Sequence, residues 1–175
     1  RIKNATDNLE TQIRGVLQYV REKPLEFKNV KLNDLINSTL DSIQIPSSVK
    51  ISVDSSDDTI QCDSDKIQIV LMNIINNAIE AVDRDGKITI SSNKSNHDTQ
   101  IHISDNGPGI PQELHDQVFF PMVSVKENGS GLGLTIAQDI IRIHGGGIIF
   151  RSNPGETIFA IQIPIKIEDK EAKIA

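Results

Sequence analysis

The sequence predicts an α/β domain, because two patterns of hydrophobic residues alternate along the chain. Helical segments with one apolar face, such as residues 65–82 and 132–143, are separated by short runs in which apolar and polar residues alternate as they do in strands. Two glycine clusters, at residues 107–109 and 129–133, flank a polar segment. Because glycine lets the backbone approach a bound molecule closely, the clusters indicate a binding site in this domain.

The composition limits the kind of protein. The chain has 175 residues, 37% of them hydrophobic, which is enough for one good core or for one domain with a small appendage. Its net charge of −6 argues against a nucleic-acid partner held through phosphate contacts. The single cysteine, Cys62, excludes an internal disulfide and provides no metal-ligand cluster. No apolar run approaches the ~20 residues of a membrane span, so we expect a chain outside the membrane, in a reducing, cytoplasmic compartment.

The chain starts without Met inside an apparent helix, and we therefore expect a fragment of a longer protein. Apolar residues in 1–23 follow steps of three and four, which predicts a helix that packs either on its own domain or, as we favour, on other helices of a dimeric bundle. We expect a linker at residues 24–30, the main domain at 31–165 and a charged tail at 166–175. The apolar positions of the first helix are Ile2, Leu9, Ile13, Val16 and Val20.

The first half of the main domain contains two predicted helices with strands between them. A helix at 32–43 carries its leucines and isoleucines on one face and ends before Pro46. A second, heavily apolar helix at 65–82 can be capped by Asp63 or Ser64, whose side-chain oxygens accept hydrogen bonds from the first backbone N–H groups. The strands between these helices are predicted at 51–53 and 59–62.

The second half is predicted to hold two hairpins around two helices. Ile101 and Ile103 alternate with polar residues and should point inward. Pro111 suits the first turn of a short helix, and the glycines after His144 suit a helix stop. The predicted elements are strands at 87–92 and 100–104, a short helix at 111–118, a helix at 132–143, and strands at 148–152 and 157–163.

The helix at 65–82 carries asparagines within an apolar sequence. An unpaired amide in apolar surroundings costs about 1–3 kcal/mol, so these side chains need partners. Asn73 and Asn77 are four residues apart and share one face, whereas Asn76 lies on another. Neutral amide oxygens can complete the shell of a hard cation such as Mg²⁺ whose main partners are phosphates. The alternative is that the asparagines cap loop backbone.

Asp105 follows a predicted strand and precedes two glycines. A carboxylate at this place can accept a hydrogen bond from the exocyclic amino group of a purine, which would select adenine over guanine. Gly107 and Gly109 would let the backbone approach the flat base. Taken alone, however, this pattern favours a tight turn capped by the aspartate.

The second glycine cluster leads directly into a helix. The backbone N–H groups around Gly129, Gly131 and Gly133 can cradle phosphate there, assisted by the helix dipole. The cluster is not a P-loop, because no Gly-Lys-Ser/Thr follows, nor a dinucleotide fingerprint, because no strand runs directly into it. Placed after the asparagine helix and the Asp105 turn, it predicts an ATP pocket.

Four segments in this order resemble the ATP-binding domain of sensor histidine kinases, within the superfamily that includes gyrase, Hsp90 and MutL. The resemblance covers residues 30–165, and residues 1–22 resemble the second helix of the dimerising four-helix bundle. It implies a two-layer α/β sandwich, the Bergerat fold, with a mixed sheet, helices on one face, and ATP between the helices and a lid. The segments are Leu71–Ala78 (the asparagine box), Asp105–Ile110 (the first glycine box), Phe119–Met122 (the phenylalanine box) and Gly129–Leu134 (the second glycine box).

The resemblance also implies individual roles. Asn77 is the expected Mg²⁺ ligand, supported by Asn73, and Asp105 is expected to recognise adenine. Lys126 either pairs with the γ-phosphate or is a solvated loop lysine, and Thr157 is expected to join the water network around adenine. The other residues implied at the ATP site are Gly107, Gly109, Ile110, Gly129, Ser130, Gly131, Leu132, Gly133 and Leu134.

One position separates a kinase from a hydrolase. ATP-hydrolysing relatives usually carry a water-activating Glu where this sequence has Asn73, and an amide cannot take a proton. The resemblance therefore implies transfer of the γ-phosphoryl group to a His, for relay to an Asp of a response regulator. Glu80 replaces the basic residue of many histidine kinases, which together with a short lid resembles the nitrogen-regulator type. An ATPase of the superfamily and a non-catalytic, nucleotide-responsive scaffold are the alternatives.

The phosphoacceptor of such kinases is a His followed by an acidic residue on the first bundle helix. This chain has four histidines: His97 at a predicted hairpin tip, His102 on a strand, His115 on a short helix beside the lid and His144 at a helix end. His115 precedes Asp116, but we expect it to be a surface residue rather than the acceptor, because it does not lie on a bundle helix. We therefore expect the acceptor to precede this chain. The resemblance further implies a response-regulator receiver domain as partner and a homodimer in the intact protein, with weak or no dimerisation of this chain alone.

Overall fold

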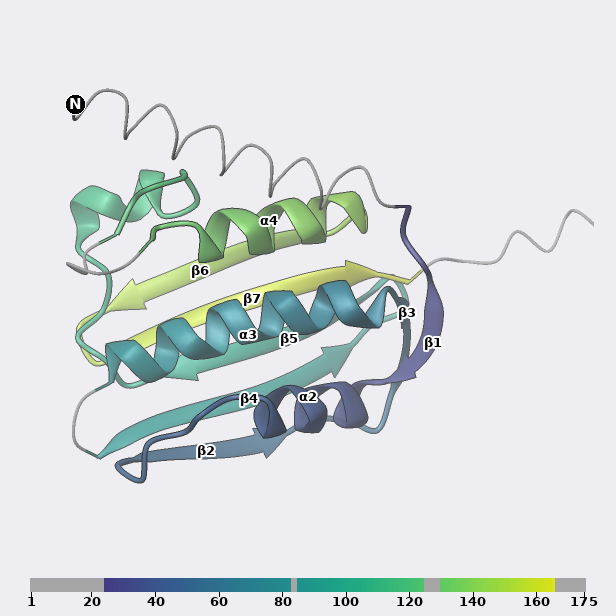
Figure 1. Ribbon diagram of the computed structural model, residues 1–175, viewed down its shortest axis with the longest axis horizontal. Coiled ribbons are helices and arrows are strands. Elements are labelled where there is room, and N and C mark those ends of the chain that lie inside the picture. The colour runs from purple at the N-terminus through teal and green to yellow at the C-terminus, as the bar shows by residue number, and fades with distance from the viewer. Residues whose placement is uncertain (1–23, 83–84, 125–129, 166–175) are drawn as a thin grey trace, which may run out of the picture.

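The computed structural model describes residues 24–82, 85–124 and 130–165, in which one layer of helices covers one face of a sheet (Figure 1). The helix predicted at 1–23 and the tail at 166–175 lie outside the described residues, as do Lys126 and Gly129. The five-stranded sheet has the order β2-β4-β5-β7-β6. β2 and β4 run parallel and the other neighbours run antiparallel, so the predicted mixed sheet is confirmed. The strands are β2 (Val49–Asp54), β4 (Gly86–Lys94), β5 (Asp98–Asp105), β6 (Gly147–Asn153) and β7 (Glu156–Pro164).

Three α-helices lie on the same face of this sheet, with α3 between the other two (Figure 1). α3 begins after Asp63, whose Oδ1 accepts a hydrogen bond from the Lys66 N–H at 3.2 Å, so one of the two predicted caps is confirmed. None of the helices described is long and apolar enough to cross a membrane. The bounds are α2 (Leu32–Asp41), α3 (Ser64–Ala81), α4 (Gly133–Ile143) and a short 3₁₀ helix, η1 (Gln112–Gln117).

A second, two-stranded sheet corrects part of the linker prediction. β1 (Lys28–Lys31) pairs antiparallel with β3 (Thr59–Cys62), although residues 28–30 were expected in a linker. The strand holds a single apolar residue, Val30, opposite Ile60, and its other side chains are exposed, so it shows no hydrophobic alternation. Its strand conformation depends on pairing with residues that are distant in sequence, which local patterns do not report.

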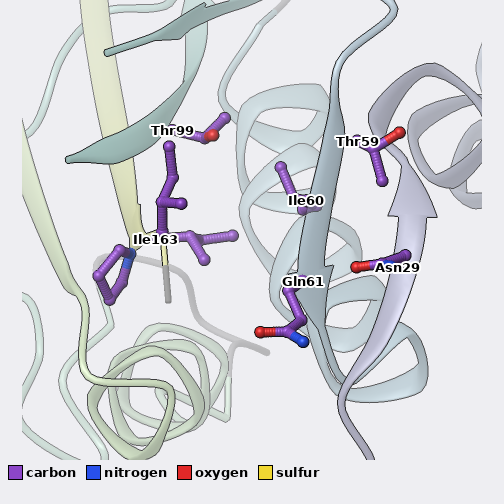
Figure 2. A pocket seen from close by; sticks show the side chains of 8 residues that line it. Asn29, Thr59, Ile60, Gln61, Thr99 and Ile163 are labelled. Carbon is purple, nitrogen blue, oxygen red and sulfur yellow. The ribbon is translucent and has the colours of Figure 1, made fainter. Parts of the chain in front are cut away.

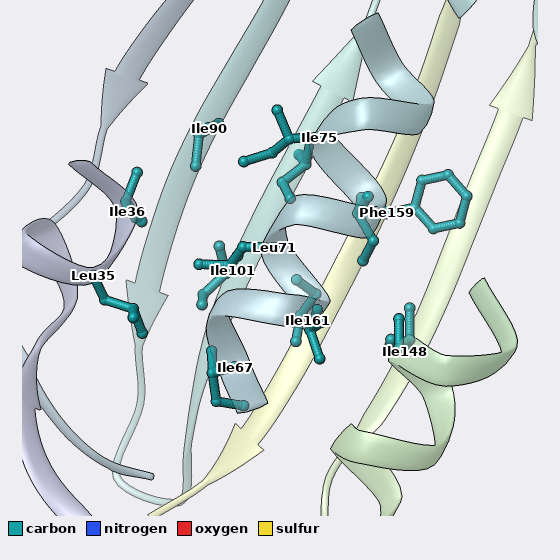
Figure 3. Packing of buried hydrophobic residues seen from close by; sticks show 14 of the residues in the cluster. Leu35, Ile36, Ile67, Leu71, Ile75, Ile90, Ile101, Ile148, Phe159 and Ile161 are labelled. Atoms are coloured by element: carbon teal, nitrogen blue, oxygen red, sulfur yellow. The ribbon is translucent and has the colours of Figure 1, made fainter. Parts of the chain in front are cut away.

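Isoleucine fills most of the space between the two layers. Ile101 and Ile103 of β5 point inward as predicted and are 0% and 1% exposed. They meet the buried face of α3, which includes Ile67, Leu71 and Ile75 (Figure 3). Fully burying a side chain of this kind contributes about 1.5–3 kcal/mol, so this seam dominates the stability of the domain.

Cys62 lies at the end of β3 with no exposed surface. Burial, with a smaller contribution from the negative charge of Asp63, raises the pKa of the thiol to about 12. The thiol therefore stays almost entirely protonated at about pH 8.

We predict that Cys62 does not react with a disulfide reagent at about pH 8 until the domain unfolds, because the thiolate is the nucleophile. Thiol titration with Ellman's reagent, with and without guanidinium chloride, measures this. Release of one equivalent from the native chain at the rate of an unfolded thiol would contradict the prediction.

Candidate functional site

The asparagines of α3 flank its buried face. Asn73, Asn76 and Asn77 are all half-buried. Within the part of the chain that the structure describes, no side-chain hydrogen bond involves any of them, so the alternative that they cap loop backbone is not observed there. Amide oxygens are hard ligands of the kind that Mg²⁺ accepts beside phosphate, and the shared face of Asn73 and Asn77 provides two of them.

The start of α4 lies directly against this face. A Cβ atom added to Gly133 would stand 3.1 Å from the Oδ1 atom of Asn73, so the end of the second glycine cluster lies close to the asparagine face. The first turn of α4 has no side-chain cap, although the backbone N–H of Leu132 donates weakly to the Ser130 Oγ at 3.4 Å. An uncapped helix start offers backbone donors and a partial positive charge to an anion.

Asp105 ends β5 and turns the chain into the first glycine cluster. The residue is buried, and its Oδ1 accepts a hydrogen bond from the Gly107 N–H at 2.9 Å. The expected capped turn is therefore present. A carboxylate can accept about four hydrogen bonds, so the capped turn does not by itself exclude a hydrogen bond to a ligand. A Cβ on Gly107 would lie 3.0 Å from the carbonyl oxygen of Ala81, which packs this turn against the end of α3.

A hydroxyl network joins the first glycine cluster to the β6–β7 hairpin. Thr157 pairs with Asp105 across β5 and β7, and its Oγ1 lies 2.8 Å from the Ser152 Oγ. Ser152 also accepts a hydrogen bond from the Ile110 N–H at 2.8 Å. Sequence reasoning missed Ser152; the only available signal was its inward position in the alternation of β6.

Gly109 and Gly131 have left-handed backbone conformations that a side chain would strain. Gly109 has φ of +85°, and an added Cβ would lie 2.7 Å from the Asn153 carbonyl oxygen. Gly131 has φ of +66°, with an added Cβ 2.6 Å from the Met122 carbonyl carbon. Both glycines are therefore required by close contacts within the protein itself, which adds a reason for their presence to the access to a ligand that the sequence suggested.

The phenylalanine box connects the polar segment to α4. Thr135 in the first turn of α4 donates to the Phe119 carbonyl at 3.0 Å, and the Met122 N–H donates to the Gly131 carbonyl at 3.1 Å. The Phe119 ring meets Phe150 edge-on, 6.0 Å between centroids. Phe120 and Met122 are instead 59% and 48% exposed. Because Lys126 and Gly129 lie outside the described residues, their expected contacts with phosphate stay predictions.

His115 and His144 make contacts that support the fold. The Nε2 of His115 lies 3.0 Å from the Ile110 carbonyl oxygen, and its ring meets Phe150 edge-on at 5.2 Å. His115, expected at the surface, is thus half-buried behind the first glycine cluster. His144 caps the end of α4 and is 3% exposed.

A cavity of about 190 Å³ lies elsewhere, between β1 and β3 on one side and the ends of β5 and β7 on the other (Figure 2). None of the predicted site residues lines it. The buried Thr99 hydroxyl in its wall has no hydrogen-bond partner among the described residues. Since ligand pockets usually measure about 300–1,000 Å³, we assign no ligand to this cavity.

Comparison with known proteins agrees with this geometry. A family model described as "Histidine kinase-, DNA gyrase B-, and HSP90-like ATPase" matches residues 62–167. The chain belongs to this family. The match includes the asparagine face, the Asp105 turn, α4 and Thr157, so the elements that meet in the structure are those of a nucleotide-binding domain.

Curated sensor kinases are similar to the chain over part of their length. The sensory histidine kinase/phosphatase NtrB of Escherichia coli O157:H7 is 38% identical over 141 residues, which are 73% of this chain and 40% of NtrB. The sensor histidine kinase ZraS of Escherichia coli K12 is 33% identical over 171 residues, 94% of this chain and 37% of ZraS. The chain thus spans about two fifths of the curated relatives that it matches.

Solved structures of histidine kinases share the fold. The catalytic domain of the histidine kinase ThkA matches with a TM-score of 0.71 and 32% identity, over 79% of this chain and 95% of that domain. ThkA in complex with the response regulator protein TrrA matches with a TM-score of 0.75 and 31% identity, over 97% of this chain and 51% of that chain. These matches confirm the predicted two-layer sandwich.

The close approach of Gly133 to Asn73 allows an effect on nucleotide binding to be separated from an effect on stability. We predict that Gly133→Ala leaves the melting temperature unchanged or raises it, because alanine favours helix by up to about 1 kcal/mol. The added methyl group should displace the Asn73 amide and weaken Mg-nucleotide binding by about fivefold or more. Thermal unfolding, calorimetric titration and the Asn73 side-chain NMR signal measure the three effects.

Gly147→Ala is the matched control, because a Cβ at Gly147 meets nothing within 4 Å. It should leave the nucleotide affinity unchanged. An unmoved Asn73 signal together with unchanged affinity in Gly133→Ala would show that the two elements do not form one site.

Proposed function

We propose that this chain is the ATP-binding catalytic part of a sensor histidine kinase, which transfers the γ-phosphoryl group of ATP to a histidine for relay to a response-regulator aspartate. The observation that carries the proposal is the close approach of the α4 start to the asparagine face of α3. A Cβ atom added to Gly133 would lie 3.1 Å from the Asn73 Oδ1. Phosphates at the helix start would lie beside amide oxygens that suit Mg²⁺.

The proposed roles follow the two ends of the site. At the base end, Asp105 accepts a hydrogen bond from the adenine amino group, and Thr157 orders water beside it. At the phosphate end, Asn77 with the support of Asn73 holds Mg²⁺, which when bound neutralises charge on the phosphates. Lys126 is proposed to pair with the γ-phosphate. The other residues proposed to line ATP are Gly107, Gly109, Ile110, Gly129, Ser130, Gly131, Leu132, Gly133 and Leu134.

The amide of Asn73 favours transfer over hydrolysis. A hydrolase needs a base that takes a proton from water, and an amide cannot serve as one. Glu80 is exposed and lies seven residues from Asn73, about 10 Å along the helix axis, so it is poorly placed to replace that base. ATP should therefore be retained until a nucleophile from another part of the protein arrives.

The proposed kinase function also implies two protein partners, a receiver domain and a second copy of the intact protein. The similarity to ThkA, which has been crystallised with a response regulator, supports a receiver domain as the final phosphoryl acceptor. A homodimer of the intact protein would bring the acceptor helix of a bundle to this domain, with residues 1–23 as the second helix of that bundle. We also propose that the reaction takes place in the cytoplasm.

We predict that this chain, given Mg²⁺ and γ-labelled ATP, labels a supplied acceptor-helix domain of its own parent protein and releases little phosphate when that domain is absent. The reason is the missing water-activating base. Label on protein and free phosphate are measured side by side. Multiple-turnover phosphate release without the acceptor would favour an ATPase, and bound ATP without labelling of the acceptor would favour a scaffold.

The Mg²⁺ assignment has an internal control in the neighbouring asparagine. We predict that Asn77→Ala weakens nucleotide binding about tenfold or more when Mg²⁺ is present, and much less when Mg²⁺ is replaced by a chelator. Asn76→Ala makes the same change of residue type on another helix face and should bind the nucleotide as tightly as the unsubstituted chain does. Equal losses in both variants, or a loss in Asn77→Ala that ignores Mg²⁺, would remove Asn77 from the metal site.

A further inference from the structure

A cluster of buried groups fastens the segment before β1 to the ends of α3 and α4. The entry segment, residues 24–27, reaches this cluster through Glu26 and Phe27. The Glu26 N–H donates to the Asp63 Oδ2 at 3.1 Å, and the Phe27 ring meets the His144 ring edge-on, 5.4 Å between centroids. Asp63 and His144 are 8% and 3% exposed. The segment is thus attached to groups that solvent hardly reaches.

Two backbone partners define the protonation of His144. Its Nδ1 lies 2.8 Å from the Ile140 carbonyl oxygen, so Nδ1 carries the proton and donates it. Its Nε2 accepts a hydrogen bond from the Asp63 N–H at 3.2 Å. A neutral ring with the proton on Nδ1 satisfies both contacts, and this ring joins the last turn of α4 to the residue that caps α3.

Asp63 extends the connection in the other direction. While its N–H is bound to His144, its Oδ1 accepts from the Lys66 N–H at 3.2 Å and its Oδ2 accepts from the Glu26 N–H. One residue therefore holds the end of α4, the start of α3 and the entry segment together. We call His144, Asp63 and the two entry residues the anchor cluster.

The two helices lead from the anchor cluster to the nucleotide site. α3 starts at the cluster, carries Asn73 at its middle, and packs its far end on the Asp105 turn through Ala81. α4 starts at Gly133 beside Asn73 and ends at His144. At about 1.5 Å per residue, the cluster lies some 15 Å from Asn73 along α3 and some 16 Å from Gly133 along α4. In Figure 1 the start of the described chain runs past these ends of the helices.

We propose that His144 is a positioning residue that docks the entry segment on α3 and α4, so that docking of this segment and nucleotide binding stabilise each other. The inference rests on the proposed function only for the identity of the ligand. A ligand that favours one arrangement of α3 and α4 favours docking, and docking raises the affinity for that ligand by the same factor, because coupling between two sites is reciprocal.

Two substitutions at His144 separate its two hydrogen bonds. His144→Gln places an amide oxygen near the former Nε2 position, so it can still accept the Asp63 N–H. His144→Asn places an amide nitrogen near the former Nδ1 position, so it keeps a donor for Ile140 but loses the contact with Asp63. Native-state hydrogen exchange of the ¹⁵N-labelled chain of 175 residues reports the Glu26 and Asp63 amides individually. The chain is measured alone and with Mg²⁺ and a non-hydrolysable ATP analogue, whose binding is followed separately by calorimetry.

In the unsubstituted chain and in His144→Gln, bound nucleotide is expected to slow hydrogen exchange at the Glu26 and Asp63 amides by about fivefold or more. In His144→Asn both amides should exchange faster without nucleotide, and nucleotide should no longer slow their exchange. The nucleotide affinity should fall by the same factor by which nucleotide slows exchange in the unsubstituted chain. Exchange at Ile101 and Ile161 in the sheet should stay the same in all three proteins. A general loss of stability would instead accelerate these core amides too.

The coupling would be overturned if bound nucleotide left the exchange rate of the Glu26 amide unchanged in the unsubstituted chain. It would also be overturned if nucleotide slowed this exchange equally in His144→Asn. If calorimetry shows no nucleotide binding at all, the proposed function fails on its own. Docking is still decided in that case, because Glu26 and Asp63 must exchange faster in His144→Asn than in His144→Gln without any ligand.

Discussion

The burial of one face of α3 against the sheet is the constraint on which the rest of the structure depends. Ile67, Leu71, Ile74 and Ile75 are fully buried, and each contributes about 1.5–3 kcal/mol when removed from water. Their burial leaves the helix one rotation about its axis, since a shift of one residue turns it by about 100°. Asn73 and Asn77 are therefore placed at the flank of the core by the hydrophobic residues around them, without side-chain hydrogen bonds among the described residues.

The register of the sheet positions the residues of the proposed base end, just as α3 positions those of the proposed phosphate end. Asp105 and Thr157 pair across β5 and β7, in the same inward rows as Ile103 and Phe159. A slip of one residue would turn both polar side chains to the other face together with every inward isoleucine. The hydrophobic cost of that slip keeps the carboxylate and the hydroxyl side by side, and the Ser152 bridge ties them to the first glycine cluster.

Sequence reasoning succeeded where the determining interactions are local. The cap at Asp63, the inward isoleucines of β5, the Asp105 turn and the start of α4 all depend on residues within a few positions. It failed where partners are distant. β1 has one apolar residue and becomes a strand by pairing with β3, and Ser152 gains its role from an N–H that is 42 residues away in the chain. His144 was recognised only as a helix end, because its partner Asp63 is 81 residues away.

The two ends of the proposed site differ in how firmly the structure holds them. The base end consists of the ends of three strands and the first glycine cluster, held by hydrogen bonds of 2.8–2.9 Å between buried or half-buried groups. The phosphate end lies at the second glycine cluster. The chain that leads to this cluster includes Phe120 and Met122, whose side chains are 59% and 48% exposed. Such an arrangement suits a kinase of the proposed kind, which must hold the base of ATP before the acceptor arrives and align the phosphates only afterwards. Because α3 and α4 connect both ends to the anchor cluster at Asp63 and His144, docking of the entry segment is the signal that we propose for that alignment.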